Sequence, residues 1–221
     1  IINYQSSFYC PSLSFILQRQ VSSSLYIKNT YMNIDSTNNE IKNCSSCEGL
    51  NKKATHDSEA TLNAPGYGDI KSNVFIIGQS LCGSPCINSQ IPFTGGCGVL
   101  LDTAFERSGV KKDQIYITNV VKCHPPKNRP SKAHEIKNCQ EYLENELNLS
   151  SPNVIICLGA DARNHFDKKA KLQTSDEVLI NGKAISIHYL YHPSFIQNRR
   201  PKEEREQYVS LITDIIIKYY V

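Results

Sequence analysis

The chain has 221 residues, of which 40% are hydrophobic and 20% charged, and a formal net charge of only +3. That length suits one domain with a substantial core, and the composition is ordinary for a globular protein. A broad basic coat for nucleic acid is excluded, so any such contact needs a local patch, and the longest apolar runs are too short to span a membrane.

The first residues, 1–31, show no periodic pattern and precede Met32, the only methionine. We interpret them as a leader that is either non-native, translated from upstream of the true start, or disordered, and we favour the first. The polar stretch that follows has one notable feature, the pair Cys44 and Cys47. We expect a single folded domain over residues 32–221.

Apolar runs and amphipathic stretches alternate from Asn73 onward, which is typical of strands alternating with helices. We predict strands over 73–78, 115–121 and 153–159, and helices over 99–109, 131–147 and 160–166. Asn181-Gly182 lies between two alternating runs and predicts a hairpin over 177–190. Pro201 begins a last helix with an apolar face.

This alternation predicts an α/β fold, a single-domain three-layer α/β/α sandwich with a mostly parallel central sheet. In such sheets, ligands bind at the loops that follow the carboxyl ends of the strands. Those loops span residues 78–98, 119–130 and 191–200, and they contain the unusual chemistry of the sequence. We therefore expect an active site at this edge of the sheet.

The nine cysteines are an odd number, whereas secreted disulfide-rich domains usually have an even set. We expect an intracellular, cytoplasmic location, a reducing compartment where clustered cysteines indicate a metal centre. Cys44 and Cys47 form a C-x2-C pair, and Cys123 and Cys139 follow later in the chain. Four thiolates suit zinc or an iron–sulfur cluster equally well by number, and buried thiols are the simpler alternative.

Three further cysteines, Cys82, Cys86 and Cys97, crowd the first loop. No fourth ligand lies near them in the sequence apart from a remote histidine. We interpret them as packing residues or incidental thiols. Cys157 lies inside a predicted strand and belongs to the core.

Three other loop residues stand out. Asn119 ends the second strand, although asparagine is depleted in strands, and its amide offers a donor and an acceptor to a nucleobase edge. His192 lies at the end of a strand, before the rigid Pro193. Phe93, beside glycines, has the chemistry to stack on a base. The simpler alternatives are a core aromatic residue and a histidine satisfied by the backbone.

Together these motifs resemble the iron–sulfur branches of the uracil-DNA glycosylase superfamily, families 4 and 5, from about Cys44 to Asn198. The segment "YITNVVKCHPPKNRPSKAHEIKNC" is similar to the family's strand, Asn, Cys, Pro-Pro-x-Asn-Arg/Lys and second Cys, in that order. "IPFTGGCGVLLD" is similar to its Pro-Phe-x-Gly segment and following helix, and "YHPS" matches its His-Pro-Ser motif. Three ordered matches at consistent spacing are hard to obtain by chance.

The resemblance implies a cofactor and a reaction. A [4Fe–4S] cluster with a structural role would be held by Cys44, Cys47, Cys123 and Cys139. The partner would be uracil-containing DNA, and the protein would act as a monomer. Uracil would be flipped out of the DNA and its N-glycosidic bond hydrolysed, leaving an abasic site.

The resemblance also implies roles for individual residues. Phe93 would stack on the flipped uracil, and Asn119 would bind its polar edge, with Gly78 lining the same site. His192 would donate to uracil O2 as the glycosidic bond breaks. The residues that would contact DNA are Arg129, Ser194 and Arg199.

The first motif departs from the family. Family 4 typically reads Gly-Glu-Ala-Pro-Gly, whereas this chain reads Gly78-Gln79-Ser80-Leu81-Cys82, with neither carboxylate nor proline. Family 5 reads Gly-Leu-Ala-Pro, and its loop length and Phe-Thr-Gly triplet match better. However, family 5 carries an Asp just after that triplet, where this chain has Gly96. Gln79 and Ser80 therefore occupy the catalytic positions of this motif without an acid.

The missing acid leaves more than one hypothesis open. An oxocarbenium-like transition state needs stabilisation of the departing base more than a strong base for water. A general base is typically worth about a hundred- to ten-thousand-fold, so the first hypothesis is a slower or differently specific glycosylase. The second is a catalytically weakened iron–sulfur protein that binds uracil-containing or damaged DNA without efficient turnover. The third is an unrelated α/β protein with a zinc ribbon.

Overall fold

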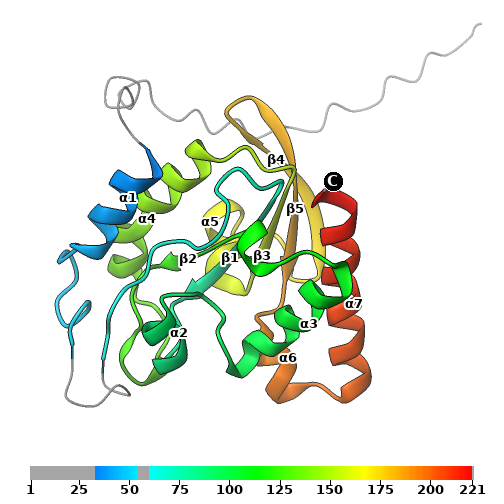
Figure 1. Cartoon of the computed structure of the whole chain (residues 1–221), viewed down its shortest axis with the longest axis horizontal. Coiled ribbons are helices and arrows are strands. Elements are labelled where there is room, and N and C mark those ends of the chain that lie inside the picture. The colour runs from blue at the N-terminus through cyan, green and yellow to red at the C-terminus, as the bar shows by residue number, and fades with distance from the viewer. Residues whose placement is uncertain (1–32, 54–59, 221) are drawn as a thin grey trace, which may run out of the picture. The chain divides into compact units, whose positions relative to one another are not determined.

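The structure is a computed structural model that describes residues 33–53 and 60–220 (Figure 1), so the predicted leader over residues 1–31 lies outside the described residues. The helices are α1 (Ile34–Lys42), α2 (Ser84–Ser89), α3 (Val99–Ser108), α4 (Ala133–Leu149), α5 (Ala160–Phe166), α6 (Pro193–Arg199) and α7 (Lys202–Tyr220). The strands are β1 (Val74–Ser80), β2 (Tyr116–Val121), β3 (Val154–Leu158), β4 (Thr174–Ile180) and β5 (Lys183–Leu190). None of the helices in the described ranges is long and apolar enough to cross a membrane.

The strands form one five-stranded sheet in the order β2-β1-β3-β5-β4. β1 pairs in parallel with β2 and β3, and β3 pairs in parallel with β5, whereas β4 and β5 form an antiparallel hairpin. The hairpin turn has positive φ angles of 52° at Asn181 and 77° at Gly182, the backbone that a two-residue turn of this kind needs. The predicted mostly parallel sheet is confirmed.

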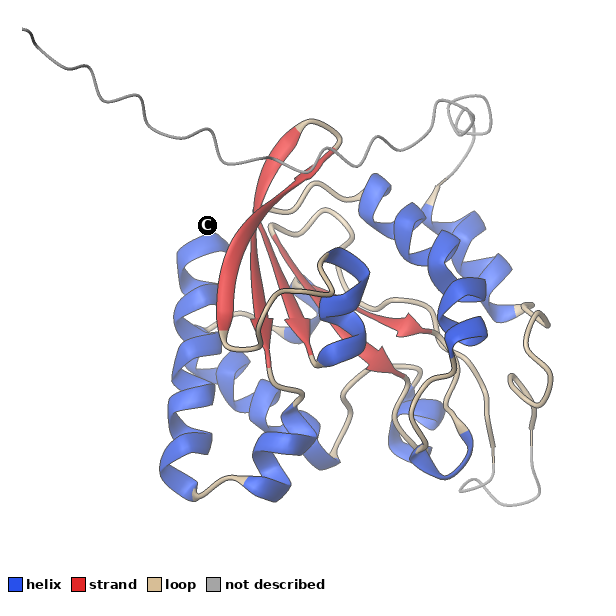
Figure 2. Ribbon diagram, turned by 180° about the vertical axis from the view of Figure 1, so that it is seen from behind, coloured by secondary structure: helices blue, strands red, loops and turns tan. Residues whose placement is uncertain are grey.

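Helices cover both faces of the sheet (Figure 2), which confirms the predicted three-layer α/β/α architecture. On one face, Val74 and Ile76 of β1 pack into a core with α3, α6 and α7. On the other face, Phe75 and Ile77 pack with α4 and α5, and α1 lies against α4. Successive residues of β1 thus point to opposite faces, so the strand is buried on both sides and reads as a continuous apolar run.

The structure differs from the sequence-based prediction at the ends and between the core elements. α1 lies in the polar stretch where no helix was predicted, because it buries only Thr37 and Ile41 and depends on a capping box at its start. α2 forms inside the loop predicted over residues 78–98. α6 begins at Pro193, where a loop was predicted; its proline occupies the first turn, a position that helices tolerate.

Candidate active site and cysteine group

Two parallel strands bring Gly78 and Asn119 together near their carboxyl ends, where the two residues are direct partners in the register of β1 and β2. Asn119 was predicted at the last position of its strand, whereas β2 continues for two more residues. A Cβ atom on Gly78 would lie 2.6 Å from Cζ of Phe93, and it would lie closer to Oδ1 of Asn119. Only glycine leaves room for both side chains, so three of the residues predicted for base binding meet at this point.

The amide of Asn119 is buried next to the Phe93 ring. Its residue is 4% exposed, and among the described residues its Oδ1 atom has no hydrogen-bond partner. Buried polar atoms are ordinarily paired, because an unpaired one costs free energy. An unpaired acceptor beside an aromatic ring is the arrangement expected where a ligand N–H supplies the missing partner.

His192 lies beside the same ring, at the N-cap of α6. The centroids of the His192 and Phe93 rings are 5.7 Å apart. Gly159, which follows β3 with a φ of 96°, packs closely against the histidine. A Cβ atom at this glycine would lie 3.2 Å from Cβ of His192. Gly159 was not predicted as part of the site, and its only signal in the sequence is a glycine at the end of a strand.

The surroundings of His192 determine its protonation. Nδ1 accepts a hydrogen bond from the backbone N–H of Ser194 at 3.2 Å and lies 2.8 Å from the Ser194 hydroxyl. Burial lowers the pKa of the imidazole to about 4. A neutral ring that accepts at Nδ1 carries its proton on Nε2. The side chain can therefore donate one hydrogen bond without being charged.

Gln79 and Ser80 are the last two residues of β1, directly after Gly78. Both are half-buried. Their uncharged side chains offer donors and acceptors at the predicted ligand edge of the sheet, and neither can act as a carboxylate base. The two residues that depart from the family motif thus lie next to Gly78 in β1, and neither of them supplies the missing carboxylate.

Two of the three residues predicted to contact DNA make contacts within the protein. Arg129 forms a two-pronged ion pair with Glu135, with N–O distances of 2.9 and 2.5 Å, which holds the loop before α4. Ser194 binds the imidazole of His192. Arg199 lies in the last turn of α6 and is exposed. Contact of these residues with DNA stays a prediction.

The four cysteines predicted as ligands form one group, the cysteine group: Cys44, Cys47, Cys123 and Cys139. Cys47 and Cys44 follow α1, Cys123 follows β2, and Cys139 lies in α4. Burial raises the pKa of Cys123 to about 12, and the nearby thiols of Cys139, Cys44 and Cys47 add to the effect. The four sulfur atoms are thus within electrostatic reach of one another, although they come from three separate parts of the chain.

The cysteine group has the donor set of a four-cysteine metal centre, as zinc sites and iron–sulfur clusters do. Nδ2 of Asn138 donates a hydrogen bond to Sγ of Cys47 at 3.3 Å, the kind of outer contact that orients a metal ligand. In the parts of the chain that the structure describes, no three His, Cys, Asp or Glu side chains are placed to hold a single metal ion. The donor type, the burial of three of the four thiols and the outer hydrogen bond suit a four-cysteine centre, whereas the placement of the side chains in the structure is not that of an assembled one.

The prediction for the cysteines of the first loop is wrong for two of them. Cys82 and Cys86 form a disulfide with a Cα–Cα distance of 5.6 Å, whereas Cys97 is a free thiol. The first turn of α2 brings the two Cα atoms within disulfide range, which spacing along the sequence did not reveal.

Comparison with known proteins agrees with the motifs. The family profile described as "Uracil DNA glycosylase superfamily" matches residues 65–215. The chain is 32% identical to the type-4 uracil-DNA glycosylase of Archaeoglobus fulgidus over 80% of this chain and 88% of that protein. It is 29% identical to the type-4 enzyme of Thermotoga maritima, over 82% and 91%. It is also 29% identical to the type-5 uracil-DNA glycosylase of Pyrobaculum aerophilum, over 59% and 65%.

Proposed function

The chain belongs to the uracil DNA glycosylase superfamily, and we propose from this membership that it removes uracil from DNA by hydrolysing the N-glycosidic bond. The family resemblance predicted from the motifs is confirmed. The observation that carries the proposal is the buried Oδ1 of Asn119, which has no hydrogen-bond partner among the described residues and lies beside Gly78, as does the ring of Phe93. His192 lies against the same ring. A base that stacks on the ring and presents an N–H to this oxygen completes the site.

Base recognition follows from the donors and acceptors of Asn119. Its Oδ1 accepts from N3–H of uracil, and its Nδ2 donates to O4, so both groups of the amide are used. The ring of Phe93 supplies the stacking surface, and Gly78 lets the base approach the strand. The nucleotide reaches this position after flipping out of the stack, which costs a few kcal/mol of unstacking free energy.

Bond cleavage depends on His192. When the bond between C1′ of the sugar and N1 of uracil breaks, its electron pair stays on the base, and negative charge develops on O2. The Nε2–H of His192 donates to that oxygen, and this hydrogen bond strengthens as the charge grows. The neutral state of the imidazole suffices, because it donates without transferring its proton.

Water completes the hydrolysis by adding to C1′ and releasing a proton to solvent or to the departed base. Gln79 and Ser80 bind and orient this water through their amide and hydroxyl groups. Neither is a strong base, so the rate is lower than in a homologue with a carboxylate here, by up to the range of about a hundred- to ten-thousand-fold that a general base contributes. The sequence departure thus lowers the rate and leaves the chemistry unchanged.

The cysteine group holds a [4Fe–4S] cluster in this proposal, with Cys44, Cys47, Cys123 and Cys139 as ligands. These ligands would be joined through the cluster, which would cross-link the chain after α1, the residues after β2 and helix α4 in a structural role. Because Cys123 lies four residues after Asn119, its ligation would also anchor the chain just after the strand that carries the base-binding amide. Zinc is the alternative, and iron and sulfide analysis distinguishes the two.

Single-turnover excision assays on uracil-containing oligonucleotides, single- and double-stranded, test the proposal, with thymine in the same position as the control. We expect abasic product from the uracil strands only. The missing acid at Gln79 and Ser80 favours a second candidate, a protein that binds uracil-containing or abasic DNA without efficient turnover. Tight binding to uracil-containing and abasic DNA without abasic product supports that candidate. If the protein neither binds these DNAs nor forms product, both candidate functions are refuted.

A further inference from the structure

The segment that carries Phe93 needs an anchor. Phe93 has a φ of 56°, in the left-handed region that is uncommon for a residue with a side chain and persists only when its surroundings hold it. The ring is only 5% exposed and lies against Gly78 and His192. Its position therefore depends on contacts that the backbone of residue 93 makes with the rest of the protein.

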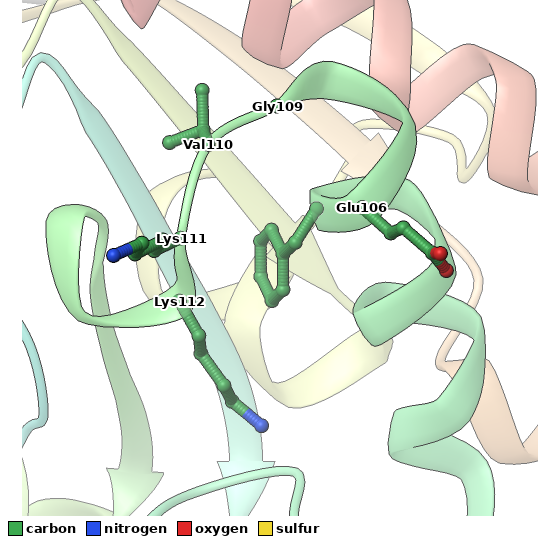
Figure 3. A pocket seen from close by; sticks show the side chains of 6 residues that line it. Glu106, Gly109, Val110, Lys111 and Lys112 are labelled. Carbon is green, nitrogen blue, oxygen red and sulfur yellow. The ribbon is translucent and has the colours of Figure 1, made fainter.

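One such contact comes from Lys112. Its Nζ atom lies 2.9 Å from the backbone carbonyl oxygen of Phe93, to which it donates a hydrogen bond, and 3.3 Å from Oδ1 of Asp102. The Lys112 side chain is 19% exposed. Figure 3 shows it extending from the chain that follows α3, beside Lys111, whose side chain points elsewhere.

A second contact comes from the start of α3. A Cβ atom on Gly98 would overlap the carbonyl oxygen and carbon of Phe93, so the absence of a side chain there lets the carbonyl lie close to the helix. The carbonyl of Phe93 is thus held between the backbone of Gly98 and the ammonium of Lys112. The ammonium is itself oriented by Asp102, a residue of α3. The backbone of Gly98 and the ammonium of Lys112, itself held by Asp102, therefore determine where the ring of Phe93 lies.

We propose that Lys112 is a positioning residue for the ring of Phe93, which rests on the role of Phe93 as the uracil-stacking residue in the proposed function. A hydrogen bond from an ammonium is stronger than one between neutral groups, and here it is largely shielded from water. Burial lowers the pKa of Lys112, and the Asp102 carboxylate opposes that effect. Without the ammonium, the left-handed segment relaxes and the ring leaves its place beside Gly78.

The variants that test this are Lys112→Met, Lys112→Arg and, as a matched control, Lys111→Met. Methionine keeps the length and apolar character of the lysine stem but donates no hydrogen bond, whereas arginine keeps the donors and the charge. Lys111 is adjacent in the sequence and exposed, so its substitution removes the same charge from the surface without touching Phe93. Equal melting temperatures of the variants establish that each folds.

Two measurements follow. The first is affinity for an oligonucleotide with 2′-fluoro-2′-deoxyuridine, whose glycosidic bond resists cleavage, compared with affinity for a tetrahydrofuran abasic analogue. The second is amide hydrogen exchange of residues 93–98 in the free protein. We expect Lys112→Met to lose about tenfold or more of the preference for the base-containing DNA, because the base loses its aromatic stacking surface. Its amides at residues 93–98 exchange faster, Lys112→Arg recovers most of both properties, and Lys111→Met resembles the parent.

Unchanged exchange at residues 93–98 in Lys112→Met overturns the inference, and so does an equal effect of Lys111→Met. If the parent shows no preference for uracil-containing over abasic DNA, the proposed function fails. The exchange measurement then decides by itself whether Lys112 holds Phe93. Failure of the function and failure of the positioning role are therefore separate outcomes.

Discussion

Nδ1 of His192 accepts a hydrogen bond from the backbone N–H of Ser194, two residues later, at 3.2 Å. This contact is the N-cap of α6, so the first turn of a helix also sets the orientation and tautomer of the candidate catalytic side chain. Because Nδ1 is an acceptor, the proton of the neutral ring is on Nε2, the atom available to a ligand. The His-Pro-Ser motif is thus a capping arrangement, in addition to the catalytic role proposed for its histidine.

The pH dependence of excision follows from this environment. Burial lowers the pKa of His192 to about 4, so the donor stays neutral as the pH falls through the ordinary histidine value of about 6.5. We expect a single-turnover rate that does not change near that value and changes only toward about pH 4, where protonation of Nδ1 removes the acceptor for the backbone N–H of Ser194 and with it the contact that orients the ring. A decrease centred on the ordinary histidine value would contradict the buried, neutral donor.

The same shift has a consequence for stability. The folded state favours the neutral imidazole, so the unfolded chain binds more protons between the two pKa values. The stabilising contribution is complete above about pH 6.5 and is lost as the pH falls toward about 4. Melting temperatures across this range should fall more steeply for the parent than for His192→Gln, which cannot titrate.

Metal analysis tests the cysteine group. After anaerobic purification we expect four iron and four inorganic sulfide per chain in the parent, following the composition of a [4Fe–4S] cluster. Cys123→Ala should lose the cluster, because one of four ligands is removed. Cys157→Ala is the matched control: Cys157 is a buried, free cysteine in β3, outside the group. Zinc in place of iron, or full loading of Cys123→Ala, refutes the assignment.

The strands and the hairpin were predictable because their signals are local. A β-branched run such as Val74–Ile77 and a turn such as Asn181-Gly182 specify their structure within a few residues. Helix α4 followed its apolar stripe only loosely, because it buries Glu135 and Glu146. Glu135 pairs with Arg129 in the loop just before the helix, and Glu146 pairs with Lys122 after β2. No helical periodicity reveals either contact.

The residues of the candidate site likewise differ in whether the sequence carries a local signal for them. Asn119 and His192 stood out in the sequence because polar side chains are unusual in or just after an apolar strand, and their roles stay predictions. The contact of Lys112 with the Phe93 carbonyl was not, since a lysine in a surface loop carries no signal of what its ammonium reaches. The disulfide between Cys82 and Cys86 likewise depends on how α2 folds. Interactions that depend on three-dimensional proximity require the structure.

A buried ion pair joins Lys122, the residue after β2, to Glu146 of α4, and removing one partner is expected to lower stability strongly. Nζ of Lys122 lies 2.6 Å from Oε2 of Glu146, with side-chain exposures of 2% and 0%, and Thr118 donates to the same oxygen at 2.8 Å. Lys122→Met leaves the carboxylate buried without its cation, which costs about 3–5 kcal/mol. Replacing both partners, as in Lys122→Met with Glu146→Leu, should recover much of that loss.

Urea unfolding followed by circular dichroism measures both effects. The control is the surface pair of Arg107 and Glu206, whose side chains are 40% and 56% exposed. Arg107→Met should change the unfolding midpoint far less than Lys122→Met, because solvent screens an exposed pair. Equal shifts of the unfolding midpoint for the two variants would show that burial does not make the loss of the Lys122 ammonium more costly to stability.

Asn119→Asp tests base recognition. An ionised carboxylate keeps the shape of the amide but cannot donate to O4 of uracil, and its charge repels the two carbonyl oxygens of the base. We expect a large loss of uracil excision, because a site built to pair a donor and an acceptor penalises an unpaired one. The melting temperature, measured on the same sample, separates this loss from unfolding. Unchanged uracil excision would remove Asn119 from the site.

His192→Ala should have the largest effect of any single substitution in the site. Charge develops on O2 of the departing uracil, and neither Gln79 nor Ser80 supplies an acid that could compensate for a lost donor. Removing one preorganised donor typically costs about a hundred- to a thousandfold in rate. We expect that decrease in single-turnover excision, with DNA affinity nearly intact. His192→Gln should retain part of the rate, because its amide can still donate.

A purely structural role for His192 gives a different pattern. The imidazole caps α6 and packs on Gly159, so a packing residue would, on substitution by alanine, lower the melting temperature and weaken DNA binding together with the rate. Measuring excision rate, DNA affinity and melting temperature on one sample therefore separates the two roles. A rate within a few-fold of the parent rules out catalysis by His192, whereas a large loss of rate at constant affinity and melting temperature assigns the donated hydrogen bond to the transition state.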